Sequence, residues 1–310
     1  MPPRRSILSA GVINYLIFAA ICLIWGSSFI LMKLGLYDEN KHPLLTASQV
    51  AAIRIITAGL VLTPVLIRHY KKVPRKLSGW MVLSGFFGSF FPAFLFCIAE
   101  TRIDSSLAGT LNSLTPIFAI LLGFLFFGNK IPVSQVVGIT IGFGGIVLLY
   151  FVQKHADAGQ VSYASLVILA TLLYGINVVV VKHYLSSVSP LVITAFSLVV
   201  VSVPSLVILW QTGFFNLPLH ERRYIRACAA VCTLGILGTA IAWMLYYILI
   251  QRTSVLFTST SSYGVPFVAF LWGWYYGETI TIGQVGCLFV ILLGVYLTRI
   301  KLNALYKKAS

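Results

Sequence analysis

Two prolines, Pro116 and Pro266, lie within long apolar stretches, and each is flanked by polar side chains. A proline has no amide hydrogen, so within a helix it leaves the carbonyl four residues earlier without its usual donor. Those carbonyls belong to Asn112 and Ser262. In hydrocarbon an unpaired carbonyl is unfavourable, and such backbone is expected only against protein or a water-filled cavity. We therefore predict polar helix kinks at Pro116 and Pro266 that together form a binding site for a small molecule.

Other polar and aromatic side chains fall in the middle of apolar stretches. Arg54 carries a guanidinium fork that suits a carboxylate, and a structural bond to neighbouring carbonyls is the alternative. The aromatic faces of Trp25 and Tyr174 can enclose an amphipathic molecule or stack on a cationic group. Serine and threonine hydroxyls often bond back to their own helix, so packing competes with binding at each of them. The predicted substrate-binding residues are Trp25, Ser28, Arg54, Asn112, Thr115, Tyr174, Asn177, Ser262 and Tyr263.

No set of residues in the sequence suits metal binding or catalysis. The five cysteines lie mostly in apolar runs, and Cys228 and Cys232 share a helix face without a His or a carboxylate beside them. Clustered acids and His residues for acid-base chemistry are missing from the apolar stretches. We therefore predict no metal, no cofactor and no enzyme activity. Glu100 and Asp104, beside Arg102, are expected to form a solvated ion-pair cluster, which leaves no obvious buried proton carrier.

The elements that carry these residues are predicted to be membrane-spanning helices. Of the 310 residues 59% are hydrophobic and 9% are charged, which excludes an ordinary water-soluble domain. An α-helix crosses the hydrocarbon core in about 20 residues, and apolar windows of that length recur along the chain. The predicted fold class is all-α integral membrane, with ten transmembrane helices. The windows are 14–34, 47–67, 78–99, 106–127, 132–152, 162–183, 190–210, 226–250, 254–276 and 281–300.

The two halves of the sequence resemble each other at an offset of 149 or 150 residues. Trp25 recurs as Tyr174, Pro116 recurs as Pro266, and several glycines follow the same pattern. Five helices per repeat is an odd number, so the second repeat enters the membrane from the opposite face and the repeats are inverted. Inverted bundles can exchange outward-open and inward-open shapes, so transport by alternating access is the leading function. The predicted organisation is an N-terminal tail (1–13), a first repeat (14–152), a linker (153–161), a second repeat (162–300) and a C-terminal tail (301–310).

The formal net charge of +15 fits a membrane protein as well. Lys and Arg collect in cytoplasmic loops, and with both termini in the cytoplasm the inner segments hold twice as many of them as the outer segments. The basic run 68–76 supports this orientation, whereas the stretch 221–226 opposes it. We expect contact with membrane lipid and not with nucleic acid. Small-residue surfaces such as Gly138 to Gly142 suit close packing or dimerisation, so the prediction is a monomer or a homodimer.

The sequence resembles the EamA-type branch of the drug/metabolite transporter superfamily. The resemblance covers about residues 14–300 and is carried by the segments 24–33 (IWGSSFILMK) and 99–116 (AETRIDSSLAGTLNSLTP). It implies a secondary transporter of the bacterial inner membrane, commonly one that exports amino acids or related metabolites. Many members have Gly-Glu in the turn after the fourth helix, where this chain has Gly128-Asn129. The second half keeps Gly277-Glu278, so an acid at this turn can act only as Glu278.

Other functions compete with export of amino-acid-like metabolites. Exchange of sugar phosphates or nucleotide sugars would need several Lys or Arg residues in the middle of the membrane, and only Arg54 is well placed. A multidrug efflux carrier is the nearest alternative, and a passive channel or a lipid flippase would use the same kind of polar groove. Replacing Asn112 or Tyr263 with Ala is expected to lower transport while leaving the amount of protein in the membrane unchanged.

Overall fold

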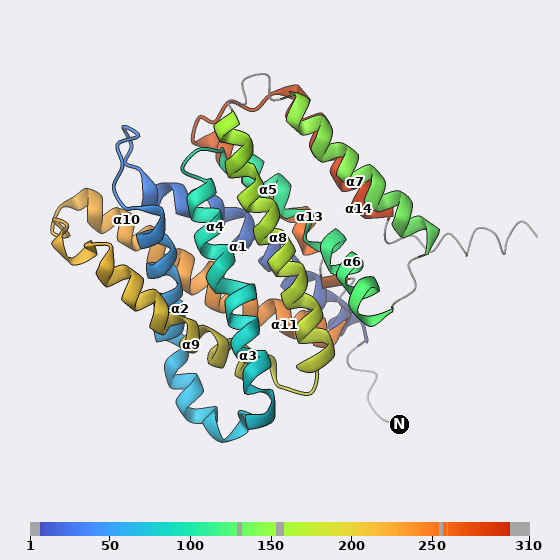
Figure 1. Cartoon of the computed structure of the whole chain (residues 1–310), viewed down its shortest axis with the longest axis horizontal. Coiled ribbons are helices and arrows are strands. Elements are labelled where there is room, and N and C mark those ends of the chain that lie inside the picture. The colour runs from blue at the N-terminus through green and yellow to red at the C-terminus, as the bar shows by residue number, and fades with distance from the viewer. Residues whose placement is uncertain (1–6, 129–131, 153–157, 254–256, 259, 298–310) are drawn as a thin grey trace, which may run out of the picture.

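A computed structural model describes residues 7–128, 132–152, 158–253, 257–258 and 260–297 of the chain (Figure 1). Every regular element of that described part is a helix, and no strand occurs in it. The all-α prediction is therefore confirmed. In chain order the first half contains α1 (Ile7–Leu36), α2 (Ala47–His69), η1 (Tyr70–Lys72), η2 (Arg75–Leu77), α3 (Ser78–Gly85), η3 (Phe86–Phe90), α4 (Phe91–Ala99), α5 (Ser105–Asn112), α6 (Thr115–Phe127) and α7 (Val133–Val152). Helices α1 and α2 are continuous. The next helical run is interrupted by the π-helical turn η3, which separates α3 from α4, and the run after it is broken near Pro116, between α5 and α6.

The second half follows a similar order of elements. Its third helical run is again interrupted by a π-helical turn, η5, at the position that matches η3 in the first half. The predicted window 254–276 begins on residues that lie outside the described ranges, and its described part holds α13. The elements are α8 (Ala158–Tyr184), α9 (Pro190–Gln211), η4 (Phe214–Asn216), α10 (Arg222–Thr233), η5 (Leu234–Ile241), α11 (Ala242–Arg252), α13 (Ser261–Tyr275) and α14 (Ile282–Leu297).

Seven helical runs in the described residues are long and apolar enough to cross a membrane. Two further apolar helices, Val133–Leu149 and Ile282–Gly294, are shorter. The structure therefore supports a multi-pass membrane protein, and the count of ten remains a prediction. The seven runs are Gly11–Leu36, Ala47–Lys72, Arg75–Ala99, Ser105–Phe127, Val161–Tyr184, Pro190–Gln211 and Arg222–Arg252.

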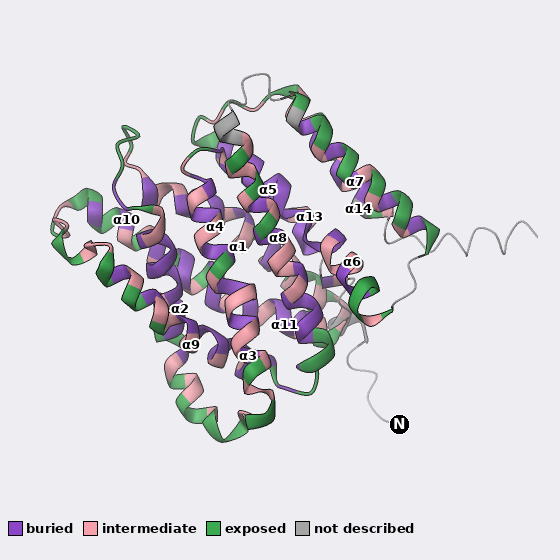
Figure 2. Ribbon diagram, in the orientation of Figure 1, coloured by how far each residue is buried: buried purple, intermediate pink, exposed green. Residues whose placement is uncertain are grey.

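Helices from the two halves of the chain pack against each other throughout the bundle. Helix α2 lies along α9, α1 along α13, and α8 against both α4 and α6. Buried residues face the centre of the bundle (Figure 2). Large exposed apolar side chains, such as Leu60 and Val203, lie on its outer faces. Such faces suit lipid, because lipid tails are as apolar as the side chains themselves. The centre of the bundle is thus the place where polar residues from both halves can meet.

Helices α7 and α14 form a pair at one edge of the bundle (Figure 1). Gly294 lies so close to α7 that an added Cβ atom would sit 2.7 Å from the Cα of Gly142 and 2.7 Å from the carbonyl oxygen of Gly138. The small-residue surface predicted from the sequence is therefore used for packing within the chain.

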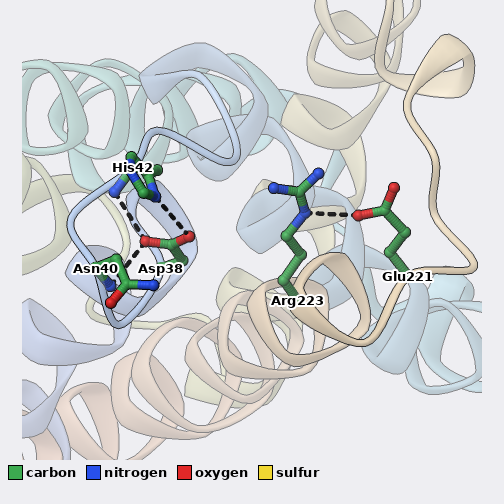
Figure 3. A network of polar contacts seen from close by, with 5 residues as sticks. All are labelled: Asp38, Asn40, His42, Glu221 and Arg223. Atoms are coloured by element: carbon green, nitrogen blue, oxygen red, sulfur yellow. Dashed lines mark hydrogen bonds and ion pairs between the residues drawn. The ribbon is translucent and has the colours of Figure 1, made fainter.

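The loop that follows α1 is held by its own polar contacts (Figure 3). Asp38 Oδ1 accepts hydrogen bonds from the backbone N–H groups of Asn40, at 2.9 Å, and His42, at 2.8 Å. These bonds lower the pKa of Asp38 below its usual range, and the bond from the His42 backbone has the largest effect. Nearby, Arg223 donates to Glu221 at 2.6 Å. All of these side chains are at the surface, so the contacts order the loop and add little to stability.

Candidate functional site

Seven of the nine predicted binding residues line one small cavity at the centre of the bundle. They come from six helices and from both halves of the chain, so the fold places these sequence positions around one cavity. The cavity has a volume of about 50 Å³. The seven residues are Trp25 and Ser28 from α1, Arg54 from α2, Asn112 from α5, Thr115 from α6, Tyr174 from α8 and Ser262 from α13.

Arg54 is the only charged residue among the described walls of this cavity. Its side chain is buried, with 7% of its surface exposed. Its Nε donates to Thr239 Oγ1 at 3.2 Å, and Nη1 lies 3.6 Å from the sulfur of Met32. Among the described residues no carboxylate lies within 4.0 Å of the guanidinium, so part of its donor capacity is unused. A guanidinium in this state can accept the carboxylate of a bound molecule through two parallel hydrogen bonds.

The two prolines have different effects on their helices. Pro116 lies in the first turn of α6, after a break that separates α6 from α5, whereas Pro266 lies within the continuous helix α13. The carbonyl of Asn112, freed by Pro116, accepts a hydrogen bond from Thr115 Oγ1 at 2.9 Å. The carbonyl of Ser262, freed by Pro266, accepts one from Ser113 Oγ at 3.2 Å.

Both carbonyls are thus satisfied by hydroxyl groups. Ser113 belongs to the first half of the chain and Ser262 to the second, so one of these bonds joins the two halves beside the cavity. Asn112 offers its side-chain amide to the cavity, and that amide has no hydrogen-bond partner within the described part of the chain. It is therefore available to a bound molecule.

Four aromatic rings form one wall of the cavity. Trp25 meets Trp243 edge to face with centroids 5.3 Å apart, and it lies 5.1 Å from Tyr246. Tyr174 meets Trp243 at 5.6 Å. Trp25 is also held by a hydrogen bond from its Nε1 to the carbonyl of Gly238 at 3.1 Å. Aromatic pairs in such arrangements hold their rings in place, so the wall presents a fixed apolar face to whatever occupies the cavity.

Glycines in the two π-helical turns make room for side chains of α1 and α8. Asn177 packs directly on Gly88 in η3, and Ser28 packs directly on Gly238 in η5, where an added Cβ would lie 2.6 Å from Ser28 Oγ. Ser28 and Asn177 are themselves related by the repeat offset of 149 residues. A π-helical turn redirects side chains and frees backbone groups, and such turns are frequent at functional sites. The two halves thus build matching contacts between a π-helical turn and a neighbouring helix.

Two predicted residues lie away from the cavity walls. Asn177 is fully buried beside the cavity, where its Oδ1 accepts from Ser84 Oγ at 2.6 Å and its Nδ2 donates to Tyr247 at 3.1 Å. Tyr263 is half-buried and packs against the main apolar core. Asn177 therefore joins α3, α8 and α11 through its amide.

The sequence analysis missed several residues that line the cavity, among them Phe96, Trp243 and Tyr246. Phe96 and Tyr246 are separated by 150 residues, so the repeat pattern itself contained the signal. At the same offset of 150 residues Trp243 matches Ala93, so the repeat pattern does not mark Trp243.

A wide vestibule of about 1300 Å³ lies at the end of the bundle where α1 and α4 finish. In the described part of the chain its walls carry seven charged side chains, which are Lys33, Asp38, Glu39, Lys41, Arg102, Asp104 and Glu278. Glu278 binds the start of α5: its Oε1 accepts from the backbone N–H of Ser105 at 2.9 Å, and its Oε2 accepts from that of Ser106 at 3.1 Å. A carboxylate at a helix N-terminus is stabilised by the free N–H groups and by the helix dipole.

The prediction of a solvated ion-pair cluster at Glu100 is wrong. Glu100 is completely buried, at 0% exposure, and it makes no ion pair among the described residues. Arg102 is exposed at the vestibule and forms no ion pair with Glu100. The difference arises because the end of α4 is covered by residues far away in sequence, which spacing alone does not reveal.

Comparison with known proteins gives a consistent picture. The model of the EamA-like transporter family matches residues 12–151 and again residues 161–300. An uncharacterized transporter of Archaeoglobus fulgidus is 25% identical over 291 residues, which cover 92% of this chain and 98% of the relative. A probable terminal-alkyne amino-acid exporter of Streptantibioticus cattleyicolor is 26% identical, with 80% of this chain and 81% of the relative covered. A probable amino-acid metabolite efflux pump of Escherichia coli is 30% identical over 130 residues, which cover 42% of this chain and 40% of the pump.

A solved structure supports the fold. One crystal structure superposes with a TM-score of 0.64 and covers 96% of this chain and 99% of its own, at 16% sequence identity. The two family matches together span most of the sequence and coincide with the internal repeat. The chain therefore belongs to the EamA-like transporter family.

Proposed function

We propose that the chain exports small amino-acid-like metabolites through the central cavity. The observation that carries this proposal is Arg54, which is buried at the cavity and has no carboxylate partner in the described structure. An amino acid has a carboxylate for the guanidinium and an ammonium group that the aromatic wall around Trp25 attracts. Two relatives named as an amino-acid exporter and an amino-acid metabolite efflux pump point to the same class of solute.

The proposed mechanism is alternating access by two inverted five-helix repeats with ten spans in total. The matching glycine contacts at η3 and η5 and the cross-half bond from Ser113 to Ser262 are what two interlocked copies of one unit would produce. The repeats would occupy 14–152 and 162–300. The membrane is the bacterial inner membrane with both termini in the cytoplasm, an orientation supported by exposed Lys71 and Lys72 after α2.

The volumes along the central axis fit one stage of such a cycle. Sites for drug-sized ligands measure roughly 300–1,000 Å³, so a cavity of about 50 Å³ is contracted. The charged vestibule reaches towards it from one end. A second apolar cluster, which includes Ile21, Leu185 and Trp243, packs beside the cavity. A substrate would therefore enter only after α1 and its neighbours move apart.

Counterflow in proteoliposomes tests the proposal. Vesicles loaded with each unlabelled L-amino acid in turn are diluted into the same labelled solute, and transient uptake identifies a carried amino acid. Uptake should be saturable and should fall in N112A and in R54Q at unchanged protein content, because both side chains line the cavity. In R54K the charge is kept and the fork is lost, so an intermediate rate is expected. Failure of every amino acid to show counterflow would contradict the proposal.

Multidrug efflux is the second candidate, and the aromatic wall favours it. Trp25, Tyr174, Trp243 and Tyr246 would suit a flat apolar cation as well as an ammonium group. Uptake of a lipophilic cation that is insensitive to R54Q would favour this reading. Flux that does not saturate would favour a passive channel, and movement of labelled lipid between leaflets would favour a flippase.

A further inference from the structure

Glu100 stands out as a buried acid that the proposed cavity does not use. It follows directly after α4, and its backbone N–H donates to the carbonyl of Phe96 at 2.9 Å. Its side chain is 0% exposed, and neither Oε1 nor Oε2 has a hydrogen-bond partner in the described structure. A buried ionised carboxylate without hydrogen bonds is strongly unfavourable, whereas the protonated form is tolerated.

Glu100 lies between the central cavity and the vestibule. Phe96, one helical turn earlier on the same face of α4, lines the cavity, and Thr101, the next residue, lines the vestibule. On α1 the same boundary falls between Met32, which lines the cavity, and Lys33, which lines the vestibule. Glu100 is therefore part of the layer that separates the substrate position from water.

Charged groups from four other parts of the chain act on Glu100. Burial is the largest influence and raises its pKa well above the usual range. Lys33 from α1 and Arg54 from α2 act in the opposite direction, while Glu278, which follows α13, and Asp104, before α5, add to the rise. Cys97, on the same turn of α4, is the remaining titratable neighbour.

These surroundings favour a proton over a metal cation. Two cations, Lys33 and Arg54, act on the site, and both oppose the approach of Na⁺ or another positive ion. Because Glu100 is buried without hydrogen-bond partners in the described structure, its neutral form is favoured, and binding one proton makes it neutral. When α1 and α4 separate, vestibule water would reach the carboxyl group and Lys33 could pair with it, so the proton would leave as hydronium. A group whose proton affinity differs between two conformations links proton concentration to the conformational equilibrium.

We propose that Glu100 is a proton-binding residue that couples this transporter to H⁺: it holds a proton in the closed arrangement described here and releases it to the vestibule when the layer around it opens. The carboxylic acid loses only H⁺ in this step, and no other reactant is required. The coupling to transport rests on the proposed function, whereas the proton-binding site rests on the burial of Glu100 and its lack of hydrogen-bond partners in the described structure.

Infrared titration of the protein in lipid vesicles tests the proton site without any substrate. At neutral pH the wild-type chain should show the C=O band of a protonated carboxylic acid, which disappears as pH rises. E100Q should lack this band. D104N is the matched control, because it removes a neighbouring acid and keeps Glu100: the band should remain and its midpoint should move to lower pH. Absence of the band in the wild type, or its persistence in E100Q, would overturn the proposal.

A second variant keeps the test decisive if E100Q does not assemble. K33Q removes a cation that acts on Glu100, so the midpoint of the band should move to higher pH. Midpoints in K33Q and D104N that equal that of the wild type would show that the band belongs to another group.

Coupling is tested in proteoliposomes with a pH-sensitive dye inside. Addition of a mixture of the twenty L-amino acids outside should drive proton movement in the wild type. E100Q should keep amino-acid counterflow and lose the proton signal, because Glu100 does not line the cavity. Amino-acid movement without protons in the wild type, or dependent on Na⁺, would overturn the coupling. If no amino acid moves, the proposed function fails and the infrared result alone decides the proton site.

Discussion

Removal of the Glu278 carboxylate should loosen the start of α5, the half-helix that leads to Asn112. Two N–H groups, from Ser105 and Ser106, donate to this side chain at 2.9 and 3.1 Å. The vestibule admits water that can replace part of these bonds, so each contributes about 0.5–1.5 kcal/mol net. The favourable interaction of a negative charge with the helix N-terminus adds about 0.3–1 kcal/mol. E278A should therefore be destabilised by about 2 kcal/mol.

Thermal unfolding of the purified protein in detergent measures this effect. E278A should lower Tm by several degrees, and E278Q, which keeps one acceptor oxygen and loses the charge, should lower it by about half as much. E39A is the matched control: Glu39 is an exposed glutamate, with 85% of its side chain in solvent, and it pairs with Arg226 only at the surface. Surface changes of this kind stay within about 0.5 kcal/mol. Equal Tm values for E278A and E39A would refute the assignment of Glu278 to the helix start.

Three further predictions concern packing, the proline site and pH. G238A should destabilise the protein by about 1–3 kcal/mol, because the new Cβ would lie 2.6 Å from Ser28 Oγ; a Tm like that of the wild type would contradict this. S113A leaves the buried carbonyl of Ser262 without its hydroxyl donor and should cost about 1–3 kcal/mol, measured as a lower urea midpoint than that of the wild type. The raised pKa of Glu100 means that its contribution to stability is fully present below the 4.5 of an ordinary glutamate and is lost as pH rises through the higher folded-state value. The free energy of unfolding, measured from pH 4 upward, should therefore fall less steeply in E100Q than in the wild type. Parallel pH curves for the two proteins would contradict this prediction.

Much of the helical architecture was predictable because it depends on local composition. Apolar windows mark the helices, since only a helix satisfies its own backbone in hydrocarbon. The break between α5 and α6 follows from Pro116 in the same direct way. The cavity residues were predictable through the internal repeat, which places Asn112 opposite Ser262 and Trp25 opposite Tyr174.

The features that the sequence did not predict depend on contacts between segments far apart in the chain. Asn177 bonds to Ser84, a residue 93 positions away, and this bond turns its amide from the cavity into the core. Glu100 looks like a loop residue in the sequence, yet residues of α1, α2 and the turn after α13 act on it and it is fully buried. Neither outcome follows from helical periodicity, because each is set by which helices pack against α4 and α8.

Thiol accessibility of residue 112 tests the central claim, that a cavity around Asn112 opens in turn to each side of the membrane. N112C is made in a chain whose native cysteines are replaced. The matched control is Leu60→Cys in the same background, at an exposed apolar position on the outer face of α2. An impermeant thiol reagent should label N112C both in intact cells and in inverted vesicles and should leave L60C unlabelled, and a transported amino acid should slow the labelling of N112C. Labelling from neither side, or labelling no faster than that of L60C, would contradict the account.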